Sequence, residues 1–333
     1  METLRIALDV SPLAQTRAGT ARYLRQLTAE LERNRDVTVR PRAFARRSRL
    51  AAPVRDVGWY LGALPLLARG DDVLHCPTFR APVRSPVPLV VTFHDLAVLR
   101  HPEAFNTWTR HYSRIMLPRV ARTATRLIAV SQFTAQELVD VLGVAAEKIR
   151  VVPNAVGKPF APEGEAAQGD YVLAVSTIEP RKNLARLVDG FRRARLNGCE
   201  LRIVGARGWG EVDLAETEGV RWLGRVSDDE LARLYRGAAC AAYVSLYEGF
   251  GLPVLEAMAC GTAVVSSDLP PVREFARGVV TVDPADPDAI AAGLTDALAR
   301  RDELGRAGRE AAAAYSWSRV ARETVDVYRE AVG

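Results

Sequence analysis

Residues 241–268, AAYVSLYEGFGLPVLEAMACGTAVVSSD, contain an apolar run, a glycine-rich turn, a short helical segment and a second apolar run. The runs over 241–245 and 263–267 predict buried β-strands. The segment over 253–260 predicts a helix, because Pro253 is suited to a first helical turn. Strands that alternate with helices are typical of parallel sheets, so this stretch predicts an α/β fold.

The same alternation runs along the whole chain. In the first half, apolar runs predict strands over 4–10, 37–41, 72–76, 88–95, 126–130 and within IRVVPNAV (149–156). In the second half, they predict strands over 171–176, 201–205, 220–224, 241–245, 263–267 and 278–284. This pattern implies parallel sheets with helices on both faces. We therefore predict two Rossmann-like, doubly wound domains that face each other across a cleft.

A break in the alternation suggests the domain boundaries. The stretch GKPFAPEGEAAQGD is rich in Gly, Pro and Ala and predicts an interdomain linker over 158–170. The first domain is then 1–157 and the second is 171–315. A closing helix over 316–333 could return to the first domain.

The composition is that of a globular protein, with 48% hydrophobic and 26% charged residues. No stretch approaches the roughly 18 apolar residues of a membrane-spanning helix, and the N-terminal METLRIALDV lacks the pattern of a signal peptide. Cys76, Cys199, Cys240 and Cys260 are far apart and form no C-x-x-C motif. They predict free thiols in a reducing cytoplasm rather than a zinc site or disulfides.

Charge is distributed unevenly between the two halves. Residues 1–160 hold 24 Lys and Arg against 13 Asp and Glu, whereas residues 161–333 hold 21 against 27. The excess of basic over acidic residues in the first half predicts an anionic partner for that half. The segment 40–55, RPRAFARRSRLAAPVR, has six arginines and no acid, so we hypothesise that it touches an anionic membrane surface or an acidic acceptor. A solvated loop is the alternative, and nucleic acid is disfavoured because no aromatic residues interleave a basic strip.

Two carboxylates, Glu248 and Glu256, flank the Gly-Phe-Gly-Leu-Pro turn. Its glycines let a ligand approach the backbone, and the amide groups of Phe250, Gly251 and Leu252 come at a helix start, which favours anions. The carboxylates could accept hydrogen bonds from the hydroxyls of a ribose and of a second polyol. The turn therefore predicts a phosphate and sugar site. A capped core helix with two solvated glutamates is the alternative.

Arg181 and Lys182 form a second constellation, between a predicted strand and a helix. A helix start disfavours cations, so two adjacent cations there indicate an anion bound between them. Arginine offers a planar fork for phosphate and lysine a compact charge. Lysine is rare in this chain, where it occurs only as Lys148, Lys158 and Lys182. A solvated surface pair is the alternative.

Three residues of the first half are further candidates. His94 ends a predicted strand on the cleft side, and Gly19 opens a helix, so that its N–H could face an anion across the cleft. For His75 a local hydrogen bond is the favoured interpretation. The chain lacks the G-x-G-x-x-G, G-K-[ST] and G-x-S-x-G motifs. The pair Asp71-Asp72 precedes a strand, so no metal site is predicted in the cleft.

Together these residues resemble the family 4 retaining glycosyltransferases, which have the two-domain GT-B architecture. The resemblance covers most of the chain and is carried by GTARYLRQL (19–27), VTFHDLAVLRHPE (91–103), IAVSQFTAQEL (128–138), STIEPRKNL (176–184) and the E-x7-E spacing over 248–256. The VTFHDLAVLRHPE stretch is similar to mannosyltransferase-like members, which points to GDP-mannose.

The resemblance implies a role for each candidate in the second half. Arg181 and Lys182 would neutralise the donor diphosphate, and Glu256 would hold the nucleotide ribose. Glu248 would hold the donor sugar, together with the amides of Phe250, Gly251 and Leu252. Many members carry an arginine a few residues before the lysine, where this chain has Ser176 or Thr177.

In the first half, the resemblance places His94 beside the sugar near the reacting carbon. Gly19 would close on the phosphate. The glycine pair often found near this helix is Ala18-Gly19 here.

The implied reaction is retaining transfer of a hexose from GDP-mannose or a UDP-sugar to a hydroxyl of a glycan, glycolipid or small-molecule acceptor. The implied reaction needs neither a metal nor a cofactor, and the first domain would bind the acceptor. The enzyme is expected in the cytoplasm or, as a peripheral protein, on the inner face of the plasma membrane. A sugar-nucleotide epimerase or phosphorylase would share the nucleotide site. A non-catalytic nucleotide-sugar-binding protein would not need Lys182 or the glutamate pair.

Overall fold

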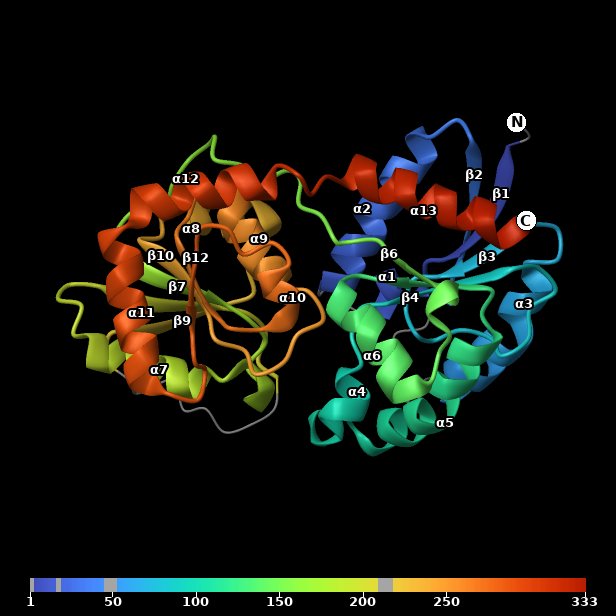
Figure 1. Cartoon of the computed structure of the whole chain (residues 1–333), viewed down its shortest axis with the longest axis horizontal. Helices are drawn as coiled ribbons and strands as arrows, with labels where there is room; N and C mark the ends of the chain where they lie inside the picture. Colours follow the sequence, from blue (N-terminus) through green and yellow to red (C-terminus); the bar gives the residue numbers. More distant parts are fainter. Residues whose placement is uncertain (1–2, 16–18, 45–52, 209–217) are drawn as a thin grey trace. The chain divides into compact units, whose positions relative to one another are not determined.

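The computed structural model describes residues 3–15, 19–44, 53–208 and 218–333, which fold into two compact units (Figure 1). The first unit consists of Met1–Asn154 and Trp317–Gly333, and the second of Ala155–Ser316. Each unit contains a six-stranded sheet whose strands are parallel to their neighbours. The predicted pair of parallel α/β domains is confirmed.

The first sheet has the strand order β2-β1-β3-β4-β5-β6. Its strands are β1 (Leu4–Asp9), β2 (Val37–Arg42), β3 (Val73–Cys76), β4 (Leu89–Phe93), β5 (Arg126–Ala129) and β6 (Ile149–Val151). All residues of β3 and β4 are buried, as expected for central strands with helices on both faces.

The second sheet has the order β12-β11-β10-β7-β8-β9. Its strands are β7 (Tyr171–Val175), β8 (Glu200–Val204), β9 (Val220–Gly224), β10 (Cys240–Tyr243), β11 (Val264–Ser267) and β12 (Val279–Val282). Each predicted strand in both halves corresponds to one of these elements, with ends that differ by a few residues.

The first unit contains seven α-helices and the π-helix η2 within the described residues. They are α1 (Ser11–Gln15), α2 (Gly19–Arg33), η2 (Val54–Ala63), α3 (Leu64–Leu67), α4 (Ala97–Arg100), α5 (Thr107–Thr123), α6 (Gln132–Leu142) and α13 (Trp317–Val332). The helical stretch from Val54 to Leu67 is divided into the π-helix η2 and the short α3. The side chain of Ser131 caps α6 by accepting from the Thr134 amide (3.0 Å).

The helices of the second unit cover its sheet. They are the 3₁₀-turn η5 (Pro180–Lys182), α7 (Leu184–Ala194), α8 (Asp228–Gly237), α9 (Leu252–Ala259), α10 (Pro270–Arg273), α11 (Pro287–Ala299) and α12 (Arg301–Ala312). Ser227 caps α8, since its hydroxyl accepts from the Glu230 amide (3.2 Å).

The segment 158–170 belongs to the second unit instead of linking two units. The guanidinium of Arg236 on α8 donates to the carbonyl oxygens of Pro159 (3.3 Å), Ala161 (3.2 Å) and Glu165 (2.7 Å). A Gly- and Pro-rich segment is therefore fixed by one arginine. The C-terminal helix α13 lies in the first unit, against α2 (Figure 1).

Two further findings concern the cysteines and the membrane. The four cysteines are free thiols, and Cys76, Cys240 and Cys260 are buried. Within the described ranges, none of the helices combines the length and the apolar composition that crossing a bilayer requires.

Candidate functional site

The candidate residues of the second unit lie on two loops that follow neighbouring strands. The loop 176–183 follows β7, and the loop 244–251 follows β10, which pairs directly with β7. Because these strands are parallel, their carboxyl ends meet at one edge of the sheet, where α/β proteins bind ligands. The two loops of the sequence motifs are thus adjacent.

Lys182 and Glu248 form an ion pair at this edge (the Lys182 ammonium donates to the Glu248 carboxylate). Their side chains are only 13% and 11% exposed. The Lys182 Nζ also lies 3.4 Å from the Tyr243 hydroxyl. The structure therefore brings together the lysine and the first glutamate, which are 66 residues apart in the sequence.

The cations keep the Glu248 carboxyl ionised. Burial alone would raise the pKa of Glu248, but the adjacent Lys182 and Arg181 charges outweigh burial and hold this pKa below its usual value. Burial raises the pKa of the neighbouring Tyr243 well above its usual value, and the Glu248 charge adds to the shift. Near neutral pH the Glu248 carboxyl is therefore ionised and the Tyr243 phenol is neutral.

Arg181 holds the loop that carries Glu248. Its guanidinium donates to the Tyr247 carbonyl (2.6 Å) and to the Glu179 carboxylate (2.6 Å), and lies 3.3 Å from a Glu248 oxygen. The Arg181 carbonyl accepts from the Leu246 amide (2.9 Å). The resemblance implied that Arg181 neutralises the donor diphosphate, whereas here both terminal NH groups of its guanidinium are directed at protein oxygens.

Asn183 is a residue that the sequence analysis missed. It adopts a left-handed conformation (φ 58°), and its buried amide donates to the carbonyls of Val244 (3.0 Å) and Pro284 (2.7 Å). Asparagine tolerates this conformation better than most residues. In the sequence, the position of this asparagine between a turn and a helix start was the feature that could have indicated its role. It anchors the Lys182 turn to the Glu248 loop.

The turn before α9 holds backbone amides at a helix start. Gly251 has φ 107°, which favours glycine, and a Cβ there would lie 3.2 Å from Val272 Cγ2. The ring of Phe250 stacks on Phe275 with centroids 5.0 Å apart. The amides of Phe250, Gly251 and Leu252 are therefore held at the start of α9, where helices favour anions.

Glu256 lies on the side of α9 that faces α8. Its side chain is 2% exposed, and one carboxylate oxygen lies 3.5 Å from the Tyr235 hydroxyl. The predicted contact of Glu256 with a ribose stays a prediction.

In the first unit, His94 directly follows β4. Its Nε2 donates to the Pro77 carbonyl (3.0 Å), because a carbonyl oxygen can only accept. The Tyr23 ring stands edge-on to the imidazole, with centroids 4.8 Å apart. Burial lowers the pKa of His94, so the ring is neutral near pH 7 and its Nδ1 carries a lone pair. Gly19 is the first residue of α2, the helix that carries Tyr23.

His75 satisfies local hydrogen bonds, as the favoured interpretation predicted. Its Nδ1 lies 2.7 Å from the Tyr328 hydroxyl of α13, and its Nε2 lies 2.9 Å from the Thr92 hydroxyl. Burial lowers the pKa of His75 to about 3. It joins the C-terminal helix to the sheet as a neutral ring.

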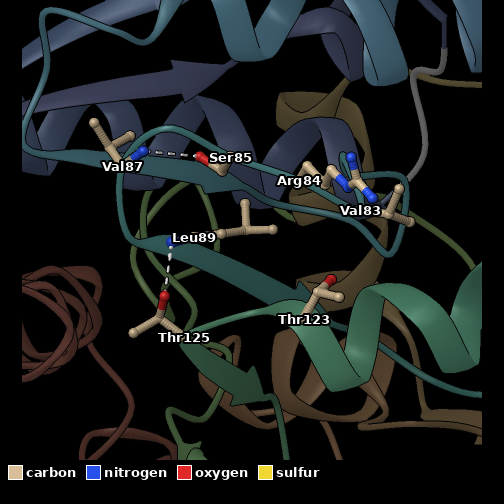
Figure 2. A pocket seen from close by; sticks show the side chains of 7 residues that line it. All are labelled: Val83, Arg84, Ser85, Val87, Leu89, Thr123 and Thr125. Atoms are coloured by element: carbon tan, nitrogen blue, oxygen red, sulfur yellow. Dashed lines mark hydrogen bonds between the residues drawn. The ribbon is translucent and has the colours of Figure 1, made fainter.

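A small pocket in the first unit lies at the other end of β4 (Figure 2). It is lined by Val83, Arg84, Ser85, Val87, Leu89, Thr123 and Thr125. Leu89 is the first residue of β4, and its amide donates to the Thr125 hydroxyl (3.0 Å). Since ligands of parallel sheets bind beyond the carboxyl ends of the strands, we assign this pocket no role in the reaction.

The segment 40–55 is only partly within the described residues. Arg40 and Arg42 form ion pairs with the buried carboxylate of Asp71 (3.2 and 3.0 Å), and Arg55 pairs with Asp56 (2.6 Å). The remaining arginines, in 46–49, lie outside the described residues. Three of the six arginines thus pair with acids of the same unit.

No metal site was predicted. In the described part of the chain, no group of three or more His, Cys, Asp or Glu side chains is arranged to hold a metal ion.

Comparison with protein families gives two matches that together cover nearly the whole chain. The family model "Glycosyl transferases group 1" matches residues 158–314. The model "Glycosyltransferase Family 4" matches residues 17–157.

Two similar proteins and one solved structure illustrate these matches. The O-antigen chain mannosyltransferase B of Escherichia coli is 30% identical over 284 residues, covering 78% of this chain and 74% of that protein. The phosphatidyl-myo-inositol mannosyltransferase of Mycobacterium tuberculosis is 33% identical over 296 residues, covering 80% and 76%. The structure of sucrose-phosphate synthase from Thermosynechococcus elongatus superposes with a TM-score of 0.80 at 20% identity, covering 98% of both chains.

Proposed function

The chain belongs to the family 4 glycosyltransferases, and from this premise we propose that it transfers mannose from GDP-mannose, with retention, to a glycan or glycolipid hydroxyl. Transfer of a sugar from a nucleotide sugar to an acceptor is the activity of the family to which it belongs. The choice of mannose is supported by the two relatives, which are named as mannosyltransferases of O-antigen chains and of phosphatidyl-myo-inositol.

The Lys182–Glu248 pair is the observation that carries this proposal. When the glycosyl bond breaks, negative charge develops on the β-phosphate of the donor. The Lys182 ammonium and the amides at the start of α9 would stabilise that charge. An arriving diphosphate would compete with Glu248 for the ammonium, and the carboxylate could then accept hydrogen bonds from the sugar hydroxyls.

The proposed reaction needs neither a metal ion nor a cofactor. A lysine ammonium and helix-terminal amides can together neutralise a diphosphate. His94 would contribute a neutral imidazole beside the sugar, since its Nδ1 can accept a hydrogen bond. Gly19 would supply a backbone amide to the phosphate, and Glu256 would hold the ribose.

Thermal denaturation with a panel of nucleotide sugars tests the donor. We expect GDP-mannose, in the presence of EDTA, to raise Tm by several degrees, because a ligand at 100 times its Kd stabilises a protein by about 2.7 kcal/mol. A larger shift with a UDP-sugar would refute GDP-mannose as the donor. The absence of a shift with every nucleotide sugar, with or without added divalent cations, would refute the site itself.

Arg181 is expected to act as a positioning residue for Glu248 and not as a ligand of the diphosphate. Its guanidinium joins Glu179 to the Tyr247 carbonyl. Replacing Arg181 by glutamine should therefore lower kcat about tenfold, roughly the effect of one or two lost hydrogen bonds, and leave the affinity for GDP within about twofold. Titration calorimetry with GDP and steady-state kinetics separate the two effects.

The control for this variant is Arg192→Gln, on the exposed face of α7. It should match the wild type in both measurements. A loss of GDP affinity in Arg181→Gln as large as that in Lys182→Ala would show that Arg181 binds the diphosphate, as the resemblance to the family implies.

We propose that the acceptor binds the first unit and that the reaction takes place at the inner face of the plasma membrane. The acceptor class follows from the relatives, one of which is named for a lipid acceptor. The arginines in 46–49 of the basic segment 40–55 also support the proposal, because their charge would attract an anionic partner.

A further inference from the structure

Exposed apolar side chains are concentrated in one part of the first unit. Ten large apolar residues are exposed in the described part of the chain, and seven of them lie on η2, α3 and α5. These seven are Val54, Val57, Leu61, Leu66, Leu67, Trp108 and Ile115, with exposed fractions between 38% and 57%. Single exposed apolar residues are ordinary on protein surfaces, but a group of this size indicates a contact surface.

The helix η2 has two different faces. Its inner face donates hydrogen bonds from Trp59 (3.4 Å) and Tyr60 (3.0 Å) to the carboxylate of Asp9, the last residue of β1. Its outer face presents Val54, Val57 and Leu61, which are 57%, 52% and 40% exposed. The inner contacts therefore fix η2 at the carboxyl end of the sheet while its apolar face points outward.

Asp56 joins η2 to α5. Its buried carboxylate accepts from the Trp108 indole (2.9 Å), and its carbonyl lies 3.5 Å from the Tyr112 hydroxyl. Arg55 (2.6 Å) and Arg80 (3.2 Å) pair with the same carboxylate. Trp108 is thus held beside η2, and the charge of Asp56 is compensated within the unit.

The exposed charge on α5 is entirely positive. Arg110, Arg114, Arg119 and Arg122 are exposed, and the helix contains no acidic residue. Across η2 and α3 the one acid is the buried Asp56. Apolar side chains accompanied by arginines and free of exposed acids are typical of helices that lie in the interface of an anionic membrane.

We propose that the outward sides of η2, α3 and α5 form a membrane-docking face that rests on anionic lipid headgroups. The apolar side chains of this face enter the headgroup layer, and the arginines of α5 contact the lipid phosphates. Charge favours a lipid surface over a second copy of the chain, because two such faces would repel each other through their arginines. The inference does not depend on the proposed sugar donor or acceptor.

Vesicle co-sedimentation of the full chain tests the docking face. The protein should bind vesicles of phosphatidylcholine with phosphatidylglycerol more tightly than vesicles of phosphatidylcholine alone, and added salt should weaken binding. Arg114→Glu should weaken binding at least fivefold, the equivalent of about 1 kcal/mol for each basic residue near the surface. Val57→Asp and Ile115→Asp should weaken binding to a similar or greater extent. Both sites are 52% exposed, so the fold should be preserved.

Two matched controls lie outside the docking face. Val332→Asp changes an apolar residue that is 49% exposed on α13, and Arg301→Glu changes an exposed arginine of the second unit. Both should bind like the wild type. The proposal is overturned if the wild type does not bind anionic vesicles, or if the face variants bind as well as the controls do. It is also overturned if the wild type is a dimer that the face variants convert to monomers, because the face would then join two copies.

Discussion

Replacing Lys182 by alanine is expected to lower kcat about 10²–10³-fold, the usual effect of removing one group that stabilises developing negative charge. The fold should survive, because Arg181 still lies 3.3 Å from the Glu248 carboxylate and keeps that buried charge paired. Steady-state kinetics with the nucleotide sugar measure the first effect, and thermal denaturation checks the second.

Lys158→Ala is the matched control. Lys158 is one of the three lysines of the chain and is exposed in the second unit. This variant should turn over like the wild type. If Lys182→Ala were equally active, the proposed role of the ammonium would be wrong.

The second large effect is expected for Glu248→Gln. This change removes the carboxylate but keeps the shape of the side chain, and it should lower kcat/KM for the nucleotide sugar about 10- to 150-fold, the range of ~1.5–3 kcal/mol for hydrogen bonds to a charged group. Affinity for GDP alone should not fall, because Lys182 loses its competing partner in the protein. Kinetics and titration with GDP measure these quantities.

For this variant the control is Glu303→Gln, at a side chain that is 61% exposed on α12. It should leave both values unchanged. A loss of GDP affinity in Glu248→Gln would mean that the carboxylate supports the nucleotide site and not the sugar.

The sheets could be predicted from the sequence because their strands are short apolar runs. In β3 and β4 all residues are buried, so the local pattern already contains the information. The segment 158–170 was misjudged as a linker for the opposite reason. The Gly and Pro residues of this segment suggest a flexible linker when only the local sequence is considered. The arginine that fixes the segment, Arg236, lies 71 residues after Glu165, to whose carbonyl it donates.

In the candidate site, too, some features could be predicted from the sequence and others depend on contacts between distant residues. The sequence predicted that Lys182 and Glu248 serve one site, and the structure joins them. The contacts of Arg181 with Glu179 and Tyr247 could not be predicted, because an arginine beside a helix start fits a phosphate ligand equally well. Asn183 was missed because its role depends on two carbonyls that only the folded chain brings near.

The most direct test is titration calorimetry of GDP and GDP-mannose against the wild type, Lys182→Ala, Glu248→Gln and the double variant. Loss of Lys182 should weaken the binding of both GDP and GDP-mannose. Loss of Glu248 should remove only the additional affinity that the sugar gives to GDP-mannose. The two effects should not be additive, since the side chains are in contact. Wild-type affinity of Lys182→Ala for GDP would contradict a diphosphate site built on this lysine.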